Sequence, residues 1–506
     1  MTRKDGTYDA PARAAKYATR AGETLSERSR GEDPCAQVDK LFNDWGGSNK
    51  TPGAAVLVMR GGKVLHEKGY GLTEVGGAEI GPRTVFELAS VSKQFTAMAV
   101  MLLKQEGKLD YSDRLSKYFK FRAPEADEVT LLQLLNHRSG LPEYGDVFAA
   151  ANLIDRHYPR SARADRGRFE PTVNDVLKAL TEQYEFTFAP GARYTYSNSG
   201  YVLLAKIVEK VSGRSFPAFM RERIFGPLGM ESSFIYQKTS RDPAEMARGH
   251  DRGWSAFNEI DYTPLDLVYG DGSVQSNLSD MRKWVLALDG LHSSSRREGG
   301  GGLPVTRATF MHALSKAQET DTPGVSYGFG WFLGEARGLK GIWHSGSWGG
   351  YRTMVMRFRS ERFTVVVLSN VAHLMPTFMA AKVATYFLEG VMERPRTPLV
   401  TEEMLAPFAK RYTDASGDYY DVTLEPEPGG RYALFLKYST LDKFKLAPVR
   451  DERGKFRGEF FVEGLYGFDA FRYTLDERRK IINVPSRPRG SVQSERSKSF
   501  GRRAKF

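Results

Sequence analysis

Cysteine is almost absent from this 506-residue sequence, and Cys35 is the only one. A single cysteine excludes an intramolecular disulfide and a metal site built from cysteines. The eight histidines are scattered along the chain without the spacing of metal ligands. We therefore expect neither a metal site nor a cofactor.

Long apolar runs are absent as well. The most apolar stretches, such as residues 363–368, are only as long as a strand, whereas a membrane-spanning helix needs about 20 apolar residues. No membrane span is therefore expected. The first residues, Met1–Asp5, are not followed by an apolar segment, so the sequence as written shows no signal peptide.

Basic residues outnumber acidic ones, and the formal net charge is +12. Residues 485–506 hold seven arginines and lysines against one glutamate, which accounts for +6 of this excess. This segment is polar and contains serine and glycine, a composition that is typical of disorder. The folded part is thus only mildly basic, and we expect no nucleic-acid partner.

The length of the chain predicts two or three domains, and a hydrophobic content of 41% suffices for sizeable cores. Changes in composition and pattern predict five segments. They are a disordered leader (1–33), a main domain (34–393), a linker (394–400), a small β domain (401–484) and a basic disordered tail (485–506).

The first half of the main domain mixes helices and strands. Apolar runs at 54–60 and 63–66 flank Gly61-Gly62, the two-residue signal of a β-hairpin. Thr130 is expected to cap a short helix that Gly140 and Pro142 bring to an end. Further helices are predicted at 38–45, from Ser90 to near Gly107, and at 176–184, 201–211 and 277–288, and an irregular loop over the site is predicted at 146–171.

After Tyr327 the pattern changes to short strands. In the main domain they are predicted at 328–334, 341–345, 351–358 and 363–369, as an antiparallel meander that a helix at 377–389 completes. In the small β domain they are predicted at 419–424, 431–436, 444–449 and 460–462.

The tetrad Ser90-Val91-Ser92-Lys93 offers the clearest chemistry in the chain. Residues three apart share one face of a helix, so Ser90 and Lys93 are expected side by side in its first turn. A serine hydroxyl is a poor nucleophile until a base takes its proton. An amine in a partly dry pocket can lose its own proton and serve as that base. Taken alone, the tetrad is also compatible with an ordinary polar first turn of a helix.

Two more motifs follow in order, Tyr196-Ser197-Asn198 and His344-Ser345-Gly346, with the segment Leu134–Pro142 before them. Together with Ser90-x-x-Lys93 they resemble the serine β-lactamase and penicillin-binding-protein-like hydrolases, most of all the class C β-lactamase, DD-peptidase and esterase branch. The resemblance covers about residues 39–390. It implies an α/β fold of the α+β type, with a helical lobe packed on an antiparallel sheet and the site in the cleft between them. The C-terminal β domain resembles the lipocalin-like appendages of some relatives.

The resemblance also implies roles for individual residues. Ser90 is expected to be the acylated nucleophile, which Lys93 helps to deprotonate. Tyr196, as a phenolate or in a proton network with Lys93, would relay protons between Ser90 and the leaving group. Asn198 would hydrogen-bond Lys93 or the substrate amide. A tyrosine and an asparagine in a turn before a helix are the alternative interpretation of this second motif.

His344-Ser345-Gly346 takes the place of the family's Lys-Thr-Gly strand motif. Gly346 would leave room for substrate to pair along the strand edge, and the N–H groups of Ser90 and Ser347 would form the oxyanion hole. His344 departs from the family pattern, because a lysine offers a permanent cation to a substrate carboxylate whereas histidine is mostly neutral near pH 7. Histidine at this position resembles the esterase, D-aminopeptidase and DD-peptidase-like relatives. The departure thus argues more against a β-lactamase than against a hydrolase.

Two further features are interpreted as structural. His137 is expected to form hydrogen bonds at the end of a helix. The segment Gly270–Ser273 is glycine-rich but lacks the ending of a phosphate-binding loop, so we interpret it as a turn near the pocket.

The favoured function is a metal-independent serine hydrolase that acts through an acyl-enzyme on an amide or ester of a small-molecule or peptide substrate. Peptidase activity on D-amino-acid peptides, esterase activity and β-lactamase activity remain alternatives. Other classes are a sensor that captures peptidoglycan-like or β-lactam ligands without turnover, and an interaction protein that uses the C-terminal domain and tail. The oligomeric state is not determined by the sequence. The resemblance suggests a periplasmic or extracytoplasmic location, although no export signal is visible.

Overall fold

The computed structural model describes most of the main domain and parts of the C-terminal region. The described residues are 33–45, 50–151, 153, 170–237, 245–252, 257–260, 267–290, 304–322, 324–393, 400–413, 419–427, 431–438, 442–450, 456–462, 472–475 and 481–482. The predicted leader, linker and tail lie outside them, apart from Asp33 and Val400.

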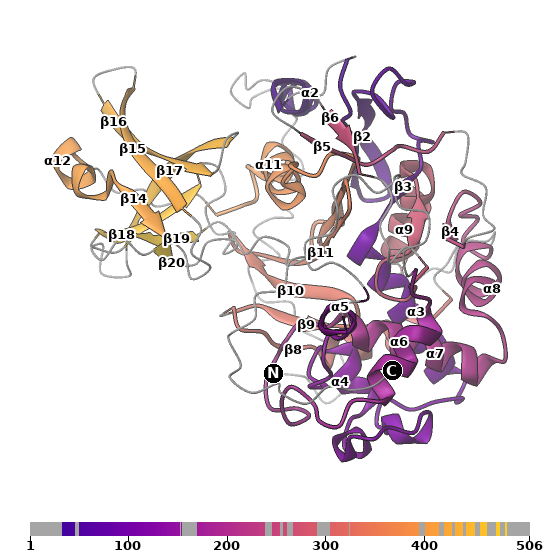
Figure 1. Ribbon diagram of the computed structural model, residues 1–506. Helices are drawn as coiled ribbons and strands as arrows, with labels where there is room; N and C mark the ends of the chain where they lie inside the picture. Colours follow the sequence, from indigo (N-terminus) through magenta and orange to yellow (C-terminus); the bar gives the residue numbers. More distant parts are fainter. Residues whose placement is uncertain are drawn as a thin grey trace, which may run out of the picture.

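An eight-stranded antiparallel sheet forms the centre of the main domain (Figure 1). Its strand order is β2-β1-β13-β12-β11-β10-β9-β8. The strands are β1 (Ala54–Arg60), β2 (Lys63–Tyr70), β8 (Gln318–Glu319), β9 (Ser326–Gly328), β10 (Trp331–Ala336), β11 (Leu339–Trp348), β12 (Tyr351–Phe358) and β13 (Phe363–Ser369).

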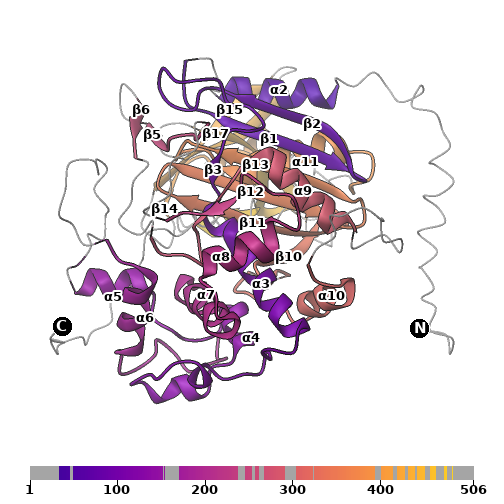
Figure 2. The same cartoon turned by 90° about the vertical axis from the view of Figure 1, so that its right-hand side faces the viewer.

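Helices cover both faces of this sheet. Val56 of β1 packs in the core under α2 (Pro34–Trp45) and α11 (Pro376–Leu388), whereas its neighbour Leu57 packs in the core shared with the helical lobe. Successive side chains of a strand point to opposite faces, so β1 is apolar along nearly its whole length. In Figure 2 the helical lobe lies below the sheet and α2 lies above it.

The helical lobe holds most of the remaining elements. Its helices are α3 (Lys93–Gln105), α4 (Leu131–Leu135), α5 (Tyr144–Ala150), α6 (Val173–Thr181), α7 (Asn198–Ser212), α8 (Phe216–Met220), α9 (Leu278–Gly290) and α10 (Arg307–Ser315). Shorter elements are the 3₁₀ turns Ala89–Ser92, Leu115–Lys117 and Pro124–Asp127, the π turn Arg221–Phe225, a small sheet of β3 (Phe86–Glu87), β7 (Val274–Ser276) and β4 (Phe234–Ile235), and the pair β5 (His250–Arg252) and β6 (Phe257–Glu259).

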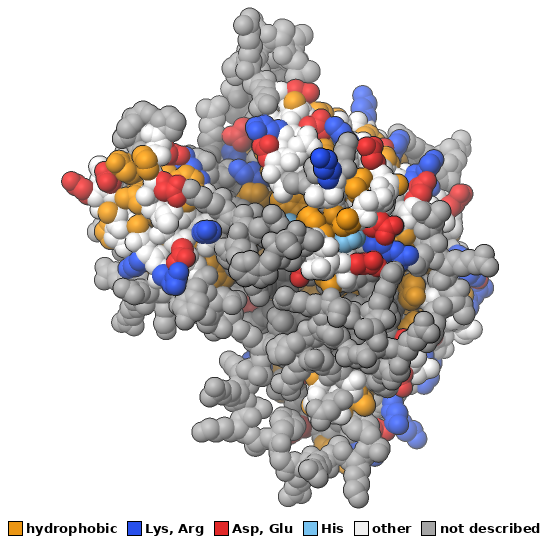
Figure 3. All heavy atoms as spheres, turned by 45° about the horizontal axis from the view of Figure 1, so that its top comes forward, with side chains coloured by type: hydrophobic (Ala, Val, Ile, Leu, Met, Phe, Trp, Pro, Cys, Tyr) orange, Lys and Arg blue, Asp and Glu red, His pale blue; other side chains and the backbone are white. Residues whose placement is uncertain are grey.

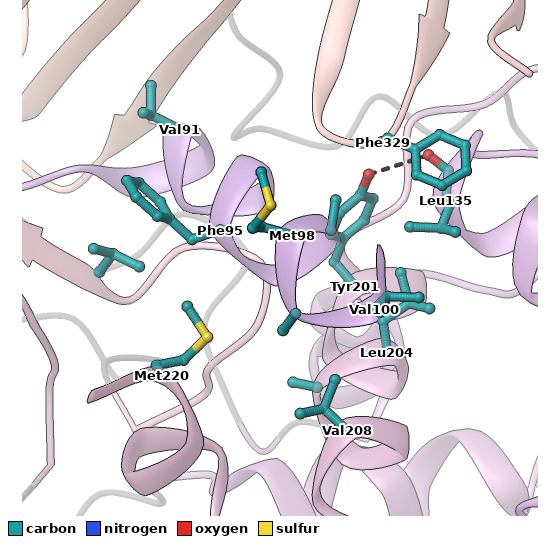
Figure 4. Packing of buried hydrophobic residues seen from close by; sticks show 14 of the residues in the cluster. Val91, Phe95, Met98, Val100, Leu135, Tyr201, Leu204, Val208, Met220 and Phe329 are labelled. Atoms are coloured by element: carbon teal, nitrogen blue, oxygen red, sulfur yellow. Dashed lines mark hydrogen bonds between the residues drawn. The ribbon is translucent and has the colours of Figure 1, made fainter. Parts of the chain in front are cut away.

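Helix α3 is the central helix of the lobe. Every residue from Lys93 to Leu103 is buried, so α3 is surrounded by protein on all sides. Figure 4 shows Met98 of α3 on the side of Tyr201 of α7, whereas Phe95 points to the opposite side of α3, where its ring packs 4.4 Å from that of Trp284. The Tyr201 hydroxyl donates a hydrogen bond of 3.1 Å to the backbone oxygen of Leu135, which ties α7 to the end of α4.

Local sequence signals explain two of these elements well. Gly61 and Gly62, with φ of 58° and 81°, form the two-residue turn between β1 and β2, where Arg60 pairs with Lys63. The predicted cap of α4 is also confirmed, because Thr130 and Gln133 form a reciprocal capping box. The predicted end at Gly140 and Pro142 is wrong, since α4 ends at Leu135.

The predicted strand 328–334 is confirmed for residues 331–334, which lie in β10, but is wrong at its start, where the chain turns. Phe329 and Gly330, with φ of 56° and 80°, form a turn between β9 and β10. Gly330 also approaches α3 so closely that a Cβ there would lie 2.7 Å from the carbonyl carbon of Lys93. Gly330 is visible in the sequence, but its close packing against α3 is a tertiary contact, which the local pattern does not predict.

Several predicted boundaries also need correction. The loop expected at 146–171 begins as helix α5, and residues 152 and 154–169 lie outside the described part. The helix predicted at 176–184 is α6, which starts earlier because Thr172 and Asp175 form a capping box. The helix predicted at 201–211 starts at Asn198, and the strand predicted at 341–345 extends from Leu339 to Trp348.

The C-terminal region forms a separate seven-stranded antiparallel meander, which lies beyond α11 in Figure 1. It comprises α12 (Glu402–Leu405), the 3₁₀ turn Ala406–Phe408, β14 (Arg411–Thr413), β15 (Tyr419–Glu427), β16 (Arg431–Tyr438), β17 (Asp442–Arg450), β18 (Phe456–Val462), β19 (Arg472–Leu475) and β20 (Ile481–Ile482). The mixed fold with a C-terminal all-β region is thus confirmed. The division into domains at 34–393 and 401–484 stays a prediction.

Two observations concern the distribution of charge and the possibility of a membrane-spanning helix. On the face drawn in Figure 3, described basic and acidic side chains are intermixed rather than gathered by sign. None of the helices in the described ranges combines the length and the apolar character that crossing a membrane requires.

A buried ion pair fixes α9 on the sheet. Arg357 of β12 donates to Asp289 of α9, and the two side chains are only 1% and 3% exposed. Arg357 also donates to Thr364 Oγ1 at 3.0 Å. Removing one member of such a pair leaves an uncompensated charge in a medium that solvates it poorly.

We expect Asp289→Ala to lower the free energy of unfolding by about 3–5 kcal/mol, because the Arg357 guanidinium remains buried without its counter-ion. Urea unfolding followed by circular dichroism measures this loss. Asp44→Ala is the matched control, since the Lys40–Asp44 pair is about 65% exposed on both sides and contributes little. Equal effects of the two substitutions would contradict the prediction.

Candidate active site

Ser90 lies in the 3₁₀ turn between β3 and α3. The preceding residue, Ala89, has φ of 47°, a left-handed conformation that residues with a Cβ rarely adopt. Lys93 is the first residue of α3, and its Nζ lies 3.2 Å from Ser90 Oγ. The sequence predicted both residues in the first turn of one α-helix. In the structure Ser90 precedes that helix, but the predicted contact is present.

The amine of Lys93 is completely buried and has three hydrogen-bond partners. Besides Ser90, Nζ donates at 2.8 Å to Asn198 Oδ1 and at 2.8 Å to the backbone oxygen of Asp271. These partners come from three different parts of the chain. They hold the amine in one position and match the three donors of an ammonium group.

Burial lowers the pKa of Lys93 to about 8, although the carboxylates of Asp271 and Glu143 favour its charged form. A neutral amine keeps two N–H donors and gains one lone pair. The backbone oxygen of Asp271 and the amide oxygen of Asn198 only accept hydrogen bonds, so they take the two N–H donors. The lone pair then faces the Ser90 hydroxyl. Neutral Lys93 is therefore arranged to accept the proton of Ser90.

Tyr196 lies over the same amine, with Lys93 Nζ 4.9 Å from the centre of its ring. Burial raises the pKa of Tyr196 well above its usual value, although the neighbouring Ser90 hydroxyl favours the phenolate. The hydroxyl group is buried and forms no hydrogen bond of regular geometry with any residue that the structure describes. The phenol is therefore protonated, which makes Lys93 rather than Tyr196 the better base for Ser90.

Glu143 holds the start of α7, where Asn198 lies. Its carboxylate accepts hydrogen bonds from the backbone N–H groups of Asn198 at 3.1 Å and Ser199 at 3.4 Å. A negative side chain at a helix N-terminus also interacts favourably with the helix dipole. Burial raises the pKa of Glu143 to about 7, although its hydrogen bonds and Lys93 favour the carboxylate. Glu143 was not among the site residues predicted from the sequence, where its only signal is a carboxylate directly after Pro142.

The turn Gly270–Ser273 lies beside Lys93, because the backbone oxygen of Asp271 accepts a hydrogen bond from the lysine amine. The Asp271 side chain accepts a hydrogen bond of 2.9 Å from the Tyr144 hydroxyl. Gly270 packs closely against the backbone of Tyr201, so a side chain there would overlap α7. The sequence indicated the turn, but the role of Asp271 as a partner of Lys93 became visible only in the structure.

His344 lies on β11 with both ring nitrogens engaged. Nδ1 is 2.7 Å from the backbone oxygen of Ser345, which only accepts, so Nδ1 carries the proton. Nε2 then accepts from the Tyr327 hydroxyl at 3.1 Å. Burial and the charge of Lys93 lower the pKa of His344 to about 3. His344 is thus neutral near pH 7 and, 6.1 Å from the ring of Tyr196, supplies no cation to the site.

Gly346 brings β11 against the turn of Ser90. A Cβ at this position would overlap the backbone oxygen of Leu88 and the hydroxyl of Thr353, which themselves form a hydrogen bond of 2.7 Å. The backbone pairing of β11 with β10 ends at Trp343, whereas its pairing with β12 continues to Trp348. The pairing with β10 thus stops before His344, and residues 344–347 of β11 are paired with β12 alone among the described strands.

The predicted site residues are brought together to different degrees. Ser90, Lys93 and Asn198 are joined by hydrogen bonds, and Tyr196 contacts Lys93. Gly346 lies against the turn that holds Ser90. Ser345 and Ser347 are placed by their register opposite Met354 and Arg352, on the segment of β11 that extends past β10.

A profile described as Beta-lactamase matches residues 38–387, more than half of the chain. The chain belongs to the beta-lactamase family. Penicillin-binding protein 4* of Bacillus subtilis is 30% identical over 472 residues, which cover 88% of this chain and 95% of that protein. A D-aminopeptidase of Gluconobacter oxydans is 28% identical, over 76% of this chain and 67% of that protein.

Solved structures show the same fold. The octameric penicillin-binding protein homologue of Pyrococcus abyssi has a TM-score of 0.62 at 24% identity, and the match covers 84% of this chain and 96% of that one. The D-amino acid amidase of Ochrobactrum anthropi has a TM-score of 0.57 at 19% identity, over 71% and 99% of the two chains. The beta-lactamase-family chain is thus a serine hydrolase with a penicillin-binding-protein-like fold, as the sequence motifs predicted.

We expect Gly346→Ala to slow the reaction of Ser90 with a fluorescent fluorophosphonate at least about a hundredfold, because the added methyl group pushes β11 away from Leu88 and Ala89. Gel fluorescence against time measures the rate. Gly81→Ala serves as the control, since a Cβ there has no heavy atom within 4 Å. Native labelling rates in Gly346→Ala would show that this close approach is not required.

Proposed function

We propose that this serine hydrolase cleaves an amide or ester bond through an acyl-enzyme on Ser90. The observation that carries the proposal is the environment of Lys93 Nζ, which lies 3.2 Å from Ser90 Oγ and is held by two further acceptors. A buried amine in this position is a base that is ready to take the proton of the nucleophile.

Acylation then proceeds from groups of this chain. Neutral Lys93 takes the proton of Ser90 while Oγ attacks the substrate carbonyl carbon. The N–H groups of Ser90 and Ser347 stabilise the negative charge that develops on the carbonyl oxygen. The Tyr196 phenol passes a proton to the leaving nitrogen or oxygen and regains one from protonated Lys93. Attack of water on the ester of Ser90, assisted by the same groups, releases the acid product and restores the serine.

The relatives favour substrates that contain D-amino acids. A D-aminopeptidase and a D-amino acid amidase are among them, and these names describe those proteins. Neutral His344 agrees with this class, because the position gives no cation for a carboxylate of the kind that β-lactams present. We therefore place amides and esters of D-amino acids before β-lactams as substrates. Capture of a ligand without turnover is the competing function, which slow deacylation would favour.

Ser90→Ala is expected to abolish fluorophosphonate labelling and to lower the hydrolysis of D-alanine p-nitroanilide and p-nitrophenyl acetate at least about a thousandfold, because the nucleophile is lost. Ser92→Ala is the matched control, since Ser92 Oγ accepts from the N–H of Val274 at 3.0 Å and is engaged in the fold. Labelling that persists in Ser90→Ala would contradict the proposal. Stoichiometric labelling without turnover of either substrate or of a chromogenic cephalosporin would favour the ligand-capturing protein.

The pH dependence follows from the pKa of Lys93 of about 8. The amine acts as a base only after it has lost its proton, so kcat/KM should rise about tenfold per pH unit below pH 8 and level off above it. His344, with a pKa of about 3, adds no step near neutrality, whereas protonation of Glu143, with a pKa of about 7, should make the fall below pH 7 steeper. Initial rates of ester hydrolysis from pH 5.5 to 9.5 measure the profile. A rate that falls with rising pH through this range would contradict Lys93 as the base.

A further inference from the structure

His137 packs against the Tyr196-Ser197-Asn198 motif. It follows the end of α4, is 1% exposed and has φ of 58°. The ring centroids of His137 and Tyr196 are 4.3 Å apart, and the ring of Tyr327 lies at the same distance on another side. His137 therefore packs between Tyr196 and Tyr327, whose hydroxyl is bonded to His344.

His137 holds the backbone on both sides of Tyr196. Its backbone oxygen accepts a hydrogen bond of 2.9 Å from the N–H of Thr195. Its Nδ1 accepts a hydrogen bond of 3.1 Å from the N–H of Ser197. His137 thus fixes the backbone of both neighbours of Tyr196. Its ring also packs against the phenol ring of Tyr196.

The second of these hydrogen bonds requires one form of the imidazole ring. Nδ1 accepts from an N–H group, so it is unprotonated, and in the neutral ring the proton lies on Nε2. Nε2 is buried and has no hydrogen-bond partner among the described residues. Burial and the charge of Lys93 lower the pKa of His137 well below its usual value, in agreement with a neutral ring.

We propose that His137 is a positioning residue for Tyr196, and that the acceptor at its Nδ1 holds the phenol over Lys93 and Ser90. This proposal rests on the proton relay by Tyr196 proposed above. It goes beyond the hydrogen-bonding role at a helix end that the sequence predicted, because the partners of His137 are the two residues beside a proposed catalytic group. A misplacement of about 1 Å in such a group can cost about a hundredfold in rate.

Two substitutions of His137 separate the hydrogen-bond acceptor Nδ1 from the aromatic ring and the backbone conformation. Both glycine and asparagine tolerate the left-handed backbone conformation, and both remove the ring. In His137→Asn the amide oxygen stands near the place of Nδ1 and can accept from Ser197, whereas His137→Gly has no acceptor. We expect kcat to fall about ten- to a hundredfold in His137→Gly and to recover most of this loss in His137→Asn, with KM changed less.

A double-mutant cycle distinguishes positioning from general stabilisation. In a Tyr196→Phe background, where the proton-carrying hydroxyl is absent, His137→Gly should cause no further loss of kcat. Each kcat is normalised to the fraction of protein that the fluorophosphonate labels at Ser90, so that poorly folded molecules are not counted. The same factor of loss in both backgrounds, or no loss in either, overturns the proposal.

The outcomes also separate this proposal from the proposed function. If Tyr196→Phe leaves kcat unchanged, the relay through Tyr196 is wrong, and the positioning role of His137 is overturned with it. If Tyr196→Phe slows the reaction and His137→Gly slows it further by the same factor, the proposed function stands and only the role of His137 fails.

A measurement on the native chain covers the case in which His137→Gly does not fold. Nitrogen-15 NMR of histidine-labelled protein should show one ring with a proton on Nε2 and none on Nδ1 from pH 5.5 to 8. Its signal is identified by its absence in His137→Asn. A proton on Nδ1 of His137 would exclude the hydrogen bond from Ser197 and would overturn the proposal.

Discussion

The amine of Lys93 is buried, and an ammonium group without partners in that position would cost several kcal/mol of stability. The structure meets this constraint with acceptors from distant segments, Asn198 at the start of α7 and Asp271 in the turn before β7. Each acceptor is held in turn by other residues, since Glu143 binds the start of α7 and Tyr144 binds the Asp271 side chain. The same arrangement that stabilises the charged amine leaves the neutral amine with its lone pair toward Ser90.

The sheet and the helical lobe must also come unusually close at this point. Gly346 of β11 touches the turn that carries Ser90, and Gly330 between β9 and β10 touches the backbone of Lys93. Both approaches need the absence of a side chain, so glycine here reflects packing as well as chain flexibility. The fold therefore places Lys93, Ser90 and the end of β11 within one region, although they belong to different elements.

Sequence patterns predicted the elements that depend on neighbouring residues. The β1–β2 hairpin follows from Gly61-Gly62, and the start of α4 follows from the capping box of Thr130 and Gln133. Predictions failed where a tertiary contact decided the backbone. The turn at Phe329-Gly330 allows the close approach to α3. The loop expected at 146–171 begins inside α5, whose Tyr144 hydroxyl donates a hydrogen bond to Asp271.

The sequence by itself indicated the groups that are proposed to react, because the motifs of Ser90 and Lys93, of Tyr196 and Asn198, and of His344 follow one another in one order. It also indicated the family, since these motifs can be recognised in the sequence without knowledge of any tertiary contact. Only the tertiary structure decided the state of these groups. Burial lowers the pKa of Lys93 to about 8 and keeps the phenol of Tyr196 protonated, and it holds His344 neutral. Protonation depends on the solvent and charges around a group, and those come from residues that are distant in sequence.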